Sequence, residues 1–296
     1  MAPAFSPGRI FHILARHFLS RNTPLLASYK LTYRCNLRCQ QCPFIDMKAP
    51  DPTYEQAKAT LDRLYERGSR IVIFEGGEPM LWHDGAYRVH DLVNYARKFF
   101  FSVGMTTNGT LPLDVKTDVL WVSVDGFAAT HDLLRGIPAF DRMRANLDRS
   151  SHPRLFAHVT VNAVNAAEIP DLLRYLDPLF KGITLQFYYP YNQRDDLYLD
   201  FNRRAALINE IIRLKRSGLK ILNSIPALRA LKANTWTCRD WLIDNANPDG
   251  SLNHGCYLKG RADIDCDRCG FSPHTEISLA FGGSLPAIRA GFRVFF

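Results

Sequence analysis

The strongest constraint on the fold is a regular alternation of short apolar runs with amphipathic helical segments, which extends from Leu25 to about Asn223. The runs that we expect to form strands are Leu26–Tyr33, Arg70–Phe74, Ser102–Thr106, Val119–Val124, Leu155–Asn162, Gly182–Tyr188 and Leu219–Leu222. The segments that we expect to form helices are Thr53–Arg67, Gly85–Lys98, Phe140–Arg149, Glu168–Phe180 and Phe201–Ser217. This alternation is typical of βαβ units and a parallel sheet. It predicts a barrel or partial barrel with functional residues on the loops after the strands.

The two ends of the chain depart from this alternation. Ser6–Ser20 is predicted to form a helix with an apolar stripe, which ends before Pro24 because the residue preceding a proline avoids the helical conformation. After Asn223 the alternation stops, and four of the seven cysteines fall between Thr237 and Gly270. We therefore expect an N-terminal amphipathic helix at 1–22, a barrel core at 23–222 and a small, loop-rich, cysteine-containing extension at 223–296.

Composition excludes several classes of protein. With 47% hydrophobic and 22% charged residues, the 296-residue chain can bury a sizeable core and is unlike a disordered protein. No apolar run approaches the ~20 residues of a membrane helix, and no secretory signal is evident. An odd number of cysteines, seven, argues against a disulfide scaffold and favours thiolate ligands in a reducing compartment. We therefore expect a cytoplasmic protein.

Three of the cysteines, Cys35, Cys39 and Cys42, form a C-x3-C-x2-C motif directly after the first expected strand. Three thiolates are one fewer than the four that close a zinc site or saturate a 4Fe-4S cluster. Such a set leaves one metal position open for an outside ligand. The alternative is a zinc knuckle that a distant residue completes.

A second motif, Glu75-Gly76-Gly77-Glu78-Pro79, follows the second expected strand. Consecutive glycines let the backbone approach a ligand closely, and exposed carbonyls can accept hydrogen bonds from an ammonium group. A glycine turn alone is weak evidence, but its position at the end of this strand, after the cysteine motif, fits an open metal site.

Together these motifs resemble the radical S-adenosylmethionine (radical SAM) superfamily, over about Ser28 to Tyr189. The resemblance implies a partial (β/α)6 barrel, with Cys35, Cys39 and Cys42 ligating a 4Fe-4S cluster whose fourth iron binds the amino and carboxylate groups of SAM. It also implies that the methionyl amine is received by Gly76, Gly77 and Glu78, and that Pro79 fixes the turn. One departure is Gln41, because many members have an aromatic residue there to pack on adenine.

Further polar residues lie at the ends of later strands, within Thr106-Thr107-Asn108-Gly109, Ser123-Val124-Asp125-Gly126 and His131–Gly136. These runs are similar to the branch that contains the molybdenum-cofactor cyclase and the SPASM peptide-modifying enzymes. By that resemblance the residues that contact SAM are Thr107, Asn108, Ser123, Arg135, Asn162 and Gln186. The alternative for each is a turn or capping role, since Asn-Gly and Asp-Gly are turn dipeptides.

The extension carries a second group of cysteines: Cys238, Cys256, Cys266 and Cys269. Four thiolates can hold a zinc ion or a second, fully ligated 4Fe-4S cluster; the alternative is four unrelated thiols. The surrounding motifs are Asn247-Pro248-Asp249-Gly250, Gly255-Cys256-Tyr257-Leu258 and Cys269-Gly270-Phe271. In this order they resemble the C-terminal region of adenosyl-hopene synthase and its relatives.

These resemblances imply an enzyme that reductively cleaves SAM to a 5′-deoxyadenosyl radical, which acts on an isoprenoid or other lipid-like substrate. The alternatives are a SPASM-like peptide-modifying enzyme and a non-enzymatic zinc or iron–sulfur protein. We expect a small-molecule or lipid-like substrate, a one-electron reductant such as flavodoxin or ferredoxin, and no nucleic acid. The acid-free basic segment before Ile45 leaves peripheral membrane contact open. No residue is assigned as catalytic, and Tyr188, Tyr189 and Tyr191 either face the cavity or pack under the extension.

Overall fold

A curved eight-stranded sheet forms the centre of the computed structural model, which describes residues 22–191, 194–260 and 262–296. The strands in spatial order are β10 (Leu252–His254), β9 (Ile243–Ala246), β1 (Leu26–Thr32), β2 (Ile71–Gly76), β5 (Ser102–Thr107), β6 (Val119–Ser123), β7 (Leu155–Val161) and β8 (Gly182–Phe187). All neighbours are parallel except β10 and β9. β10 and β8 are the two edges of the sheet, so the barrel is partial, as expected.

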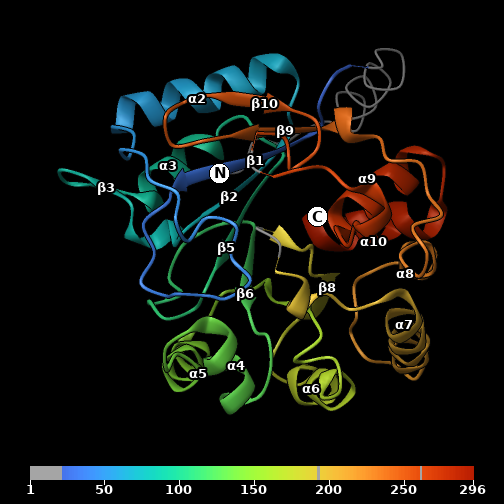
Figure 1. Cartoon of the computed structure of the whole chain (residues 1–296). Coiled ribbons are helices and arrows are strands. Elements are labelled where there is room, and N and C mark those ends of the chain that lie inside the picture. The colour runs from blue at the N-terminus through green and yellow to red at the C-terminus, as the bar shows by residue number, and fades with distance from the viewer. Residues whose placement is uncertain (1–21, 192–193, 261) are drawn as a thin grey trace.

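Helices surround the outer face of the sheet (Figure 1). They are α2 (Tyr54–Arg67), α3 (Val89–Ala96), α4 (Ala128–Arg135), α5 (Phe140–Arg149), α6 (Ile169–Leu176) and α7 (Phe201–Arg216). The sequence gives local reasons for these bounds. The side chain of Thr53 caps the first turn of α2 in a reciprocal pair with Gln56, and Gly68, at φ +123°, ends the helix.

Two expected elements differ from the structure, and one helix of the barrel was not expected. Leu219–Leu222 is not a strand: it contributes an isolated bridge between Ile221 and Ile183 at the edge of β8. The helix predicted from Gly85 begins at Val89, because β3 (His83–Asp84) and β4 (Tyr87–Arg88) form a hairpin before it. Helix α4 was not predicted. The predicted helix Ser6–Ser20 lies outside the described residues.

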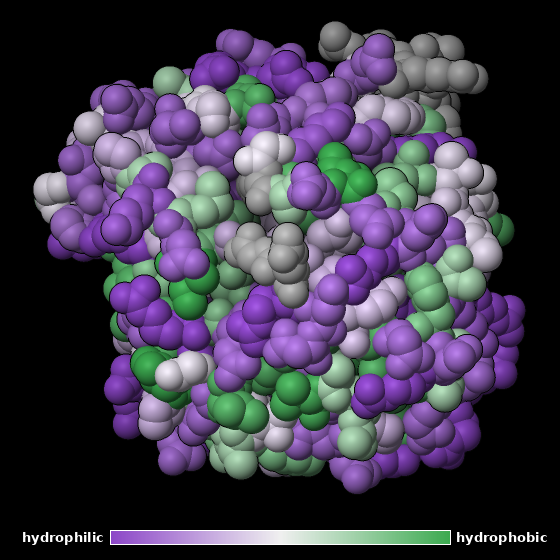
Figure 2. Space-filling model, viewed as in Figure 1, coloured by the Kyte–Doolittle hydropathy of each residue, from purple (hydrophilic) through white to green (hydrophobic). Residues whose placement is uncertain are grey.

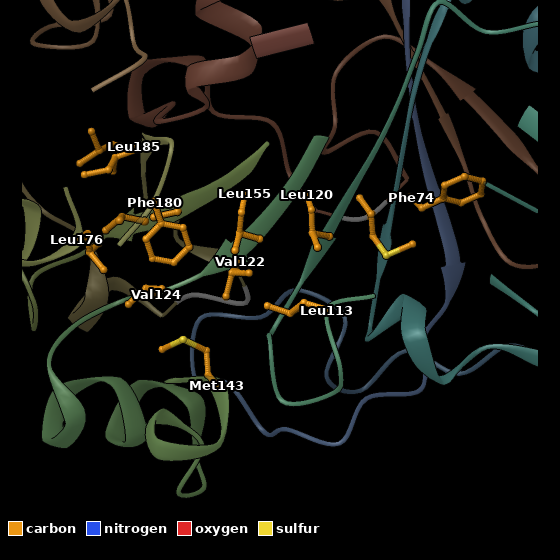
Figure 3. Close-up of a cluster of buried hydrophobic side chains, with 14 of the residues drawn as sticks. Phe74, Leu113, Leu120, Val122, Val124, Met143, Leu155, Leu176, Phe180 and Leu185 are labelled. Atoms are coloured by element: carbon orange, nitrogen blue, oxygen red, sulfur yellow. The ribbon is translucent and has the colours of Figure 1, made fainter. Parts of the chain in front are cut away.

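The main core lies between the outer face of the sheet and the helices. Alternate strand residues supply it, as Leu120, Val122 and Val124 do from β6 and the loop after it, and Met143 of α5 packs in the same cluster (Figure 3). Because side chains alternate along a strand, the residues between these point to the inner face. The arrangement of the core therefore defines which residues line the inside of the barrel.

The inner face changes character along the strands. Near the amino ends it carries apolar side chains, among them Val119, Trp121 and Phe156. Toward the carboxyl ends it carries polar ones: Ser28, Lys30, Glu75, Thr106, Ser123, His158, Thr160, Thr184 and Gln186. The apolar end is covered by helix α10 (Leu285–Phe295), whose Phe295 contacts Trp121 with ring centroids 6.0 Å apart.

The extension adds strands to the sheet and helices beside it. β9 pairs in parallel with β1, while α8 (Ile225–Ala230) and α9 (Ser272–Phe281) pack with α10 on the open side of the barrel (Figure 1). The extension is loop-rich where its cysteines lie. No helix in the described part of the chain is both long and apolar enough to cross a membrane. Hydrophilic residues predominate on the face shown in Figure 2.

We predict that Phe295 secures the covered end of the barrel. Replacing Phe295 with Ala should lower the free energy of unfolding by about 2 kcal/mol, below the ~3–5 kcal/mol typical of a fully buried Phe because this ring is only partly buried. The matched control is Phe292→Ala on the same helix, where 53% of the side chain is exposed and we expect a change within about 0.5 kcal/mol. Thermal unfolding of the anaerobically purified protein measures both. Equal effects would contradict a capping role for α10.

Candidate active site

The loop that follows β1 carries Cys35, Cys39 and Cys42 and lies against the end of α4. The amide of Arg38 donates to the carbonyl of Arg135 at 3.1 Å, and the amide of Gln40 donates to that of Leu134 at 2.9 Å. Gly136 ends α4 with φ +76°, and a Cβ there would lie 2.3 Å from the carbonyl oxygen of Arg38. Only glycine fits this close approach. The contact fixes the cysteine loop at the carboxyl end of the sheet.

The three thiols of this loop are close neighbours. Burial, together with the negative charges of Cys39 and Cys35, raises the pKa of Cys42 to about 12. Hydrogen-bond donors reach two of the sulfurs: the Nδ2 of Asn108 lies 3.9 Å from the Sγ of Cys35, and the Nη1 of Arg135 lies 3.8 Å from that of Cys39. Such donors stabilise thiolates, which is the form that binds a metal.

The glycine motif after β2 packs directly on the start of the cysteine loop. The amide of Gly77 donates to the carbonyl of Thr32 at 2.7 Å, and that of Glu78 donates to the carbonyl of Arg34 at 2.8 Å. A Cβ on Gly77 would lie 2.2 Å from the carbonyl oxygen of Arg34. Gly76 meets the carbonyl of Thr32 equally closely. The glycines are therefore required for the contact between the two motifs.

Glu78 has a structural role that the sequence did not predict. Its side chain is fully buried and accepts hydrogen bonds from the Oγ1 of Thr107 at 2.8 Å, the amide of Asn108 at 2.8 Å and the amide of Met80 at 3.1 Å. Burial raises the pKa of this carboxyl, while the hydrogen bonds lower it. Glu78 thus joins the end of β2 to the end of β5, and Pro79 starts the short 3-10 helix Pro79–Leu81.

Gln41 occupies the position where we noted the missing aromatic residue, and it bridges two later strands. Its Nε2 donates to Asp125 at 2.7 Å, and its Oε1 accepts from the Nδ2 of Asn162 at 2.7 Å. Asp125 is fully buried and pairs with Arg135 at 2.5 Å. Sequence reasoning missed Asp125 and this role of Gln41.

The remaining expected residues lie on the rim formed by the carboxyl ends of the strands, where the cysteine loop and the glycine motif also lie. Ser123 ends β6 and pairs in register with His158 of β7. The Nε2 of Gln186 in β8 donates to the Oγ1 of Thr160 at 3.3 Å, and the amide of Thr160 donates to Asp125 at 3.1 Å. Arg135 therefore contacts Asp125 directly, whereas Asn162 is linked to it through Gln41 and Gln186 through Thr160.

Two polar groups on the inner face were not predicted. The buried ammonium of Lys30 lies 2.7 Å from Glu75 and 3.3 Å from the Oδ1 of Asn245, and 3.9 Å above the ring of Tyr257. His158 shares a hydrogen bond with Thr184 at 3.0 Å, and burial lowers its pKa to about 4. The period-two alternation of the strands could have identified both.

The three tyrosines after β8 pack beneath the extension. Tyr188, Tyr189 and Tyr191 are buried in one cluster with Phe271. The hydroxyl of Tyr189 donates to the carbonyl of Asp263 at 2.7 Å and accepts from the amide of Asp265. Of the two alternatives that the sequence left open for these tyrosines, the structure shows packing under the extension.

The second group of cysteines also gathers in one region. Burial, together with the charges of Asp240 and of the other three thiols, raises the pKa of Cys238 to about 12. The pKa of Cys269 is raised to about 11 by burial and then by Cys256 and Cys266. No three His, Cys, Asp or Glu side chains in the described ranges converge closely enough to hold a single metal ion.

Comparison with known proteins identifies the family. The model of the radical SAM superfamily matches residues 29–176. The chain belongs to this superfamily. It is accordingly an enzyme of the radical SAM type, a superfamily whose cofactors are a 4Fe-4S cluster and SAM.

The relatives share part of their length with this radical SAM protein. It is 30% identical to the pre-heme d1 synthase of Dinoroseobacter shibae, over 54% of this chain and 42% of the relative. It is 34% identical to the AdoMet-dependent heme synthase of Methanosarcina barkeri, over 50% and 46%. The matches thus span less than half of these relatives. They give no support to the specific resemblance to adenosyl-hopene synthase.

Solved structures support the fold. SuiB of Streptococcus suis, bound to its precursor peptide SuiA, superposes with a TM-score of 0.66 at 14% identity, covering 87% of this chain and 66% of SuiB. Methylornithine synthase (PylB) superposes with a TM-score of 0.57 at 16% identity, covering 97% and 92%. At these identities the likeness concerns the fold alone.

The contact between the two motifs yields a prediction. In Gly77→Ala the new Cβ meets the backbone of Arg34, so we expect a loss of about 1–3 kcal/mol in stability and reduced iron loading. The control is Gly291→Ala in α10, where nothing lies within 4 Å of the added Cβ. That change should stabilise the protein by about 0.5–1 kcal/mol because alanine favours helix. Thermal unfolding and iron analysis measure both variants, and full iron loading of Gly77→Ala would contradict the prediction.

Proposed function

We propose that Cys35, Cys39 and Cys42 hold the 4Fe-4S cluster and leave its fourth iron to SAM. The donor set supports this proposal: three neighbouring thiols lie at the carboxyl rim, with amide and guanidinium donors near two of them. When bound, these cofactors supply a 5′-deoxyadenosyl radical by one-electron cleavage of SAM, the electron coming from a reductant such as flavodoxin or ferredoxin. The observation that carries the proposal is the contact of the glycine motif with this cysteine loop.

The other residues of the rim would bind and orient SAM. The carbonyls of Gly76 and Gly77 remain the candidates for receiving the methionyl amine, whereas the carboxylate of Glu78 is already held by three donors. Glu78 would act by fixing Thr107 and Asn108. Arg135, paired with Asp125, would lend its positive charge to the cluster side of the rim. Ser123, Asn162 and Gln186 stay candidate SAM contacts.

For the substrate we favour a polar molecule over an isoprenoid. The inner face near the rim carries Lys30, Glu75 and His158, and a wall of this charged and polar character suits a polar molecule better than a hydrocarbon chain. Relatives of the chain are named as heme synthases, and we propose a tetrapyrrole or similar polar molecule as the first candidate. A peptide is the second, because the mycofactocin maturase MftC of Mycobacterium tuberculosis is also a relative, at 26% identity. A lipid-like substrate with membrane contact is the third.

We further propose that Cys238, Cys256, Cys266 and Cys269 hold a second metal centre, a 4Fe-4S cluster in preference to zinc. The charges of Cys256, Cys266 and Cys269 all act on the pKa of Cys238, so the four thiols share one neighbourhood. A zinc ion draws its sulfurs to about 2.3 Å, whereas a cluster spreads its ligands over the corners of a cube.

The first centre is tested by replacing Cys35, Cys39 and Cys42 with Ala. After anaerobic reconstitution with SAM and dithionite, we expect formation of 5′-deoxyadenosine to fall to background, because no ligands remain for the open cluster. The matched control replaces Cys238 alone with Ala and should retain measurable SAM cleavage. SAM cleavage by the triple variant would refute the proposal. Stimulation of the wild-type reaction by porphyrins, peptides or polyprenyl compounds separates the substrate classes.

The second centre is tested by metal counting. Two 4Fe-4S clusters require about eight irons per chain, and we expect about half of this iron to remain in the triple variant. One zinc per chain beside four irons would show that the second group of cysteines holds zinc and not a cluster. A total of about four irons without zinc would show that the second group binds no metal.

A further inference from the structure

Arg204, in the first turns of α7, is a buried cation without an acidic partner in the described part of the chain. Its side chain is fully buried. The guanidinium carbon lies 5.1 Å from the ring centroid of Phe187, 5.4 Å from that of Tyr198 and 5.1 Å from that of Phe201. These rings surround the group but offer little compensation for a lost hydration shell.

The side-chain hydrogen bond of Arg204 is to the second group of cysteines. The Nη1 donates to the carbonyl oxygen of Cys269 at 2.8 Å. The Nε and Nη2 are buried and have no hydrogen-bond partner. The positive charge of Arg204 also acts on the thiol of Cys269, whose pKa it lowers against the larger effect of burial. The unused donors and the uncompensated charge therefore lie within electrostatic range of a thiol.

We propose that Arg204 is the counter-cation of an anionic metal–thiolate centre on Cys238, Cys256, Cys266 and Cys269. A buried, unpaired cation costs several kcal/mol, and an anion of this kind removes that cost. Four thiolates leave either a zinc ion or a 4Fe-4S cluster with net negative charge, so the argument holds for both metals. Arg204 is thus a positioning residue that stabilises the centre and, for a cluster, favours its reduced, more negative state. The inference rests on the proposed second centre.

The test compares Arg204→Met, Arg204→Lys and Arg213→Met in the full chain, with Cys35, Cys39 and Cys42 replaced by Ala so that all metal reports on the second centre. Met fills the space between the aromatic rings without charge, and Lys keeps the charge. Arg213, on the same helix, is exposed and pairs with Glu210, so its replacement is the control. We expect the rate of metal release to a chelator to rise about tenfold in Arg204→Met, to rise less in Arg204→Lys and to be unchanged in the control.

For an iron centre, a potentiometric titration adds a second readout. The midpoint potential should become more negative in Arg204→Met, because loss of a positive charge disfavours reduction. The same variants in the wild-type background, with iron and zinc counted per chain, serve if the triple variant does not fold. If Arg204→Met keeps the wild-type metal retention and midpoint potential, the proposed role of Arg204 is wrong and the proposed second centre still stands. A chain whose second cysteines hold neither iron nor zinc would overturn the proposed centre and the inference together.

Discussion

The alternation of side chains along parallel strands is the constraint on which the rest of this structure depends. Because neighbouring residues of a strand point to opposite faces, one set is committed to the outer core and the other to the inside of the barrel. Val122 and Leu120 face the helices, while Ser123 and Trp121 face inward. The parallel direction then brings all the carboxyl ends to one rim, so that motifs far apart in sequence meet there.

At the rim, main-chain hydrogen bonds hold the glycine motif against the cysteine loop, and side-chain hydrogen bonds hold the ends of the strands together. The glycine motif packs on the cysteine loop through main-chain hydrogen bonds at Gly77 and Glu78, and only residues without a Cβ permit that distance. The carboxylates of Glu78 and Asp125 are then buried among donors, which tie β2 to β5 and the cysteine loop to β7. Buried carboxylates satisfied in this way hold a site in one geometry, since any displaced partner leaves an uncompensated charge.

The sequence predicted what is local and periodic. Six of the expected strands correspond to β1, β2, β5, β6, β7 and β8, and the cysteine and glycine motifs lie together as expected. Long-range partners could not be predicted. Nothing near Gln41 in sequence indicates Asp125 or Asn162, and Arg204 is 65 residues from its partner Cys269. The resemblance to the family predicts that Glu78 helps to receive the methionyl amine, but it gives no sign of the donors at the end of β5 that hold its carboxylate.

The extension differs from the barrel in its sequence pattern, but it packs against the barrel as part of the same structure. β9 continues the sheet beside β1, Asn245 and Tyr257 contact the buried ammonium of Lys30, and Phe295 covers the apolar end of the inner face. Removing these groups would expose Lys30 on one side and Trp121 on the other. A partial barrel has an open side and an apolar end that must be covered, and here the segment that bears the second cysteines does both. The two groups of cysteines are therefore held relative to each other by the same packing that completes the core.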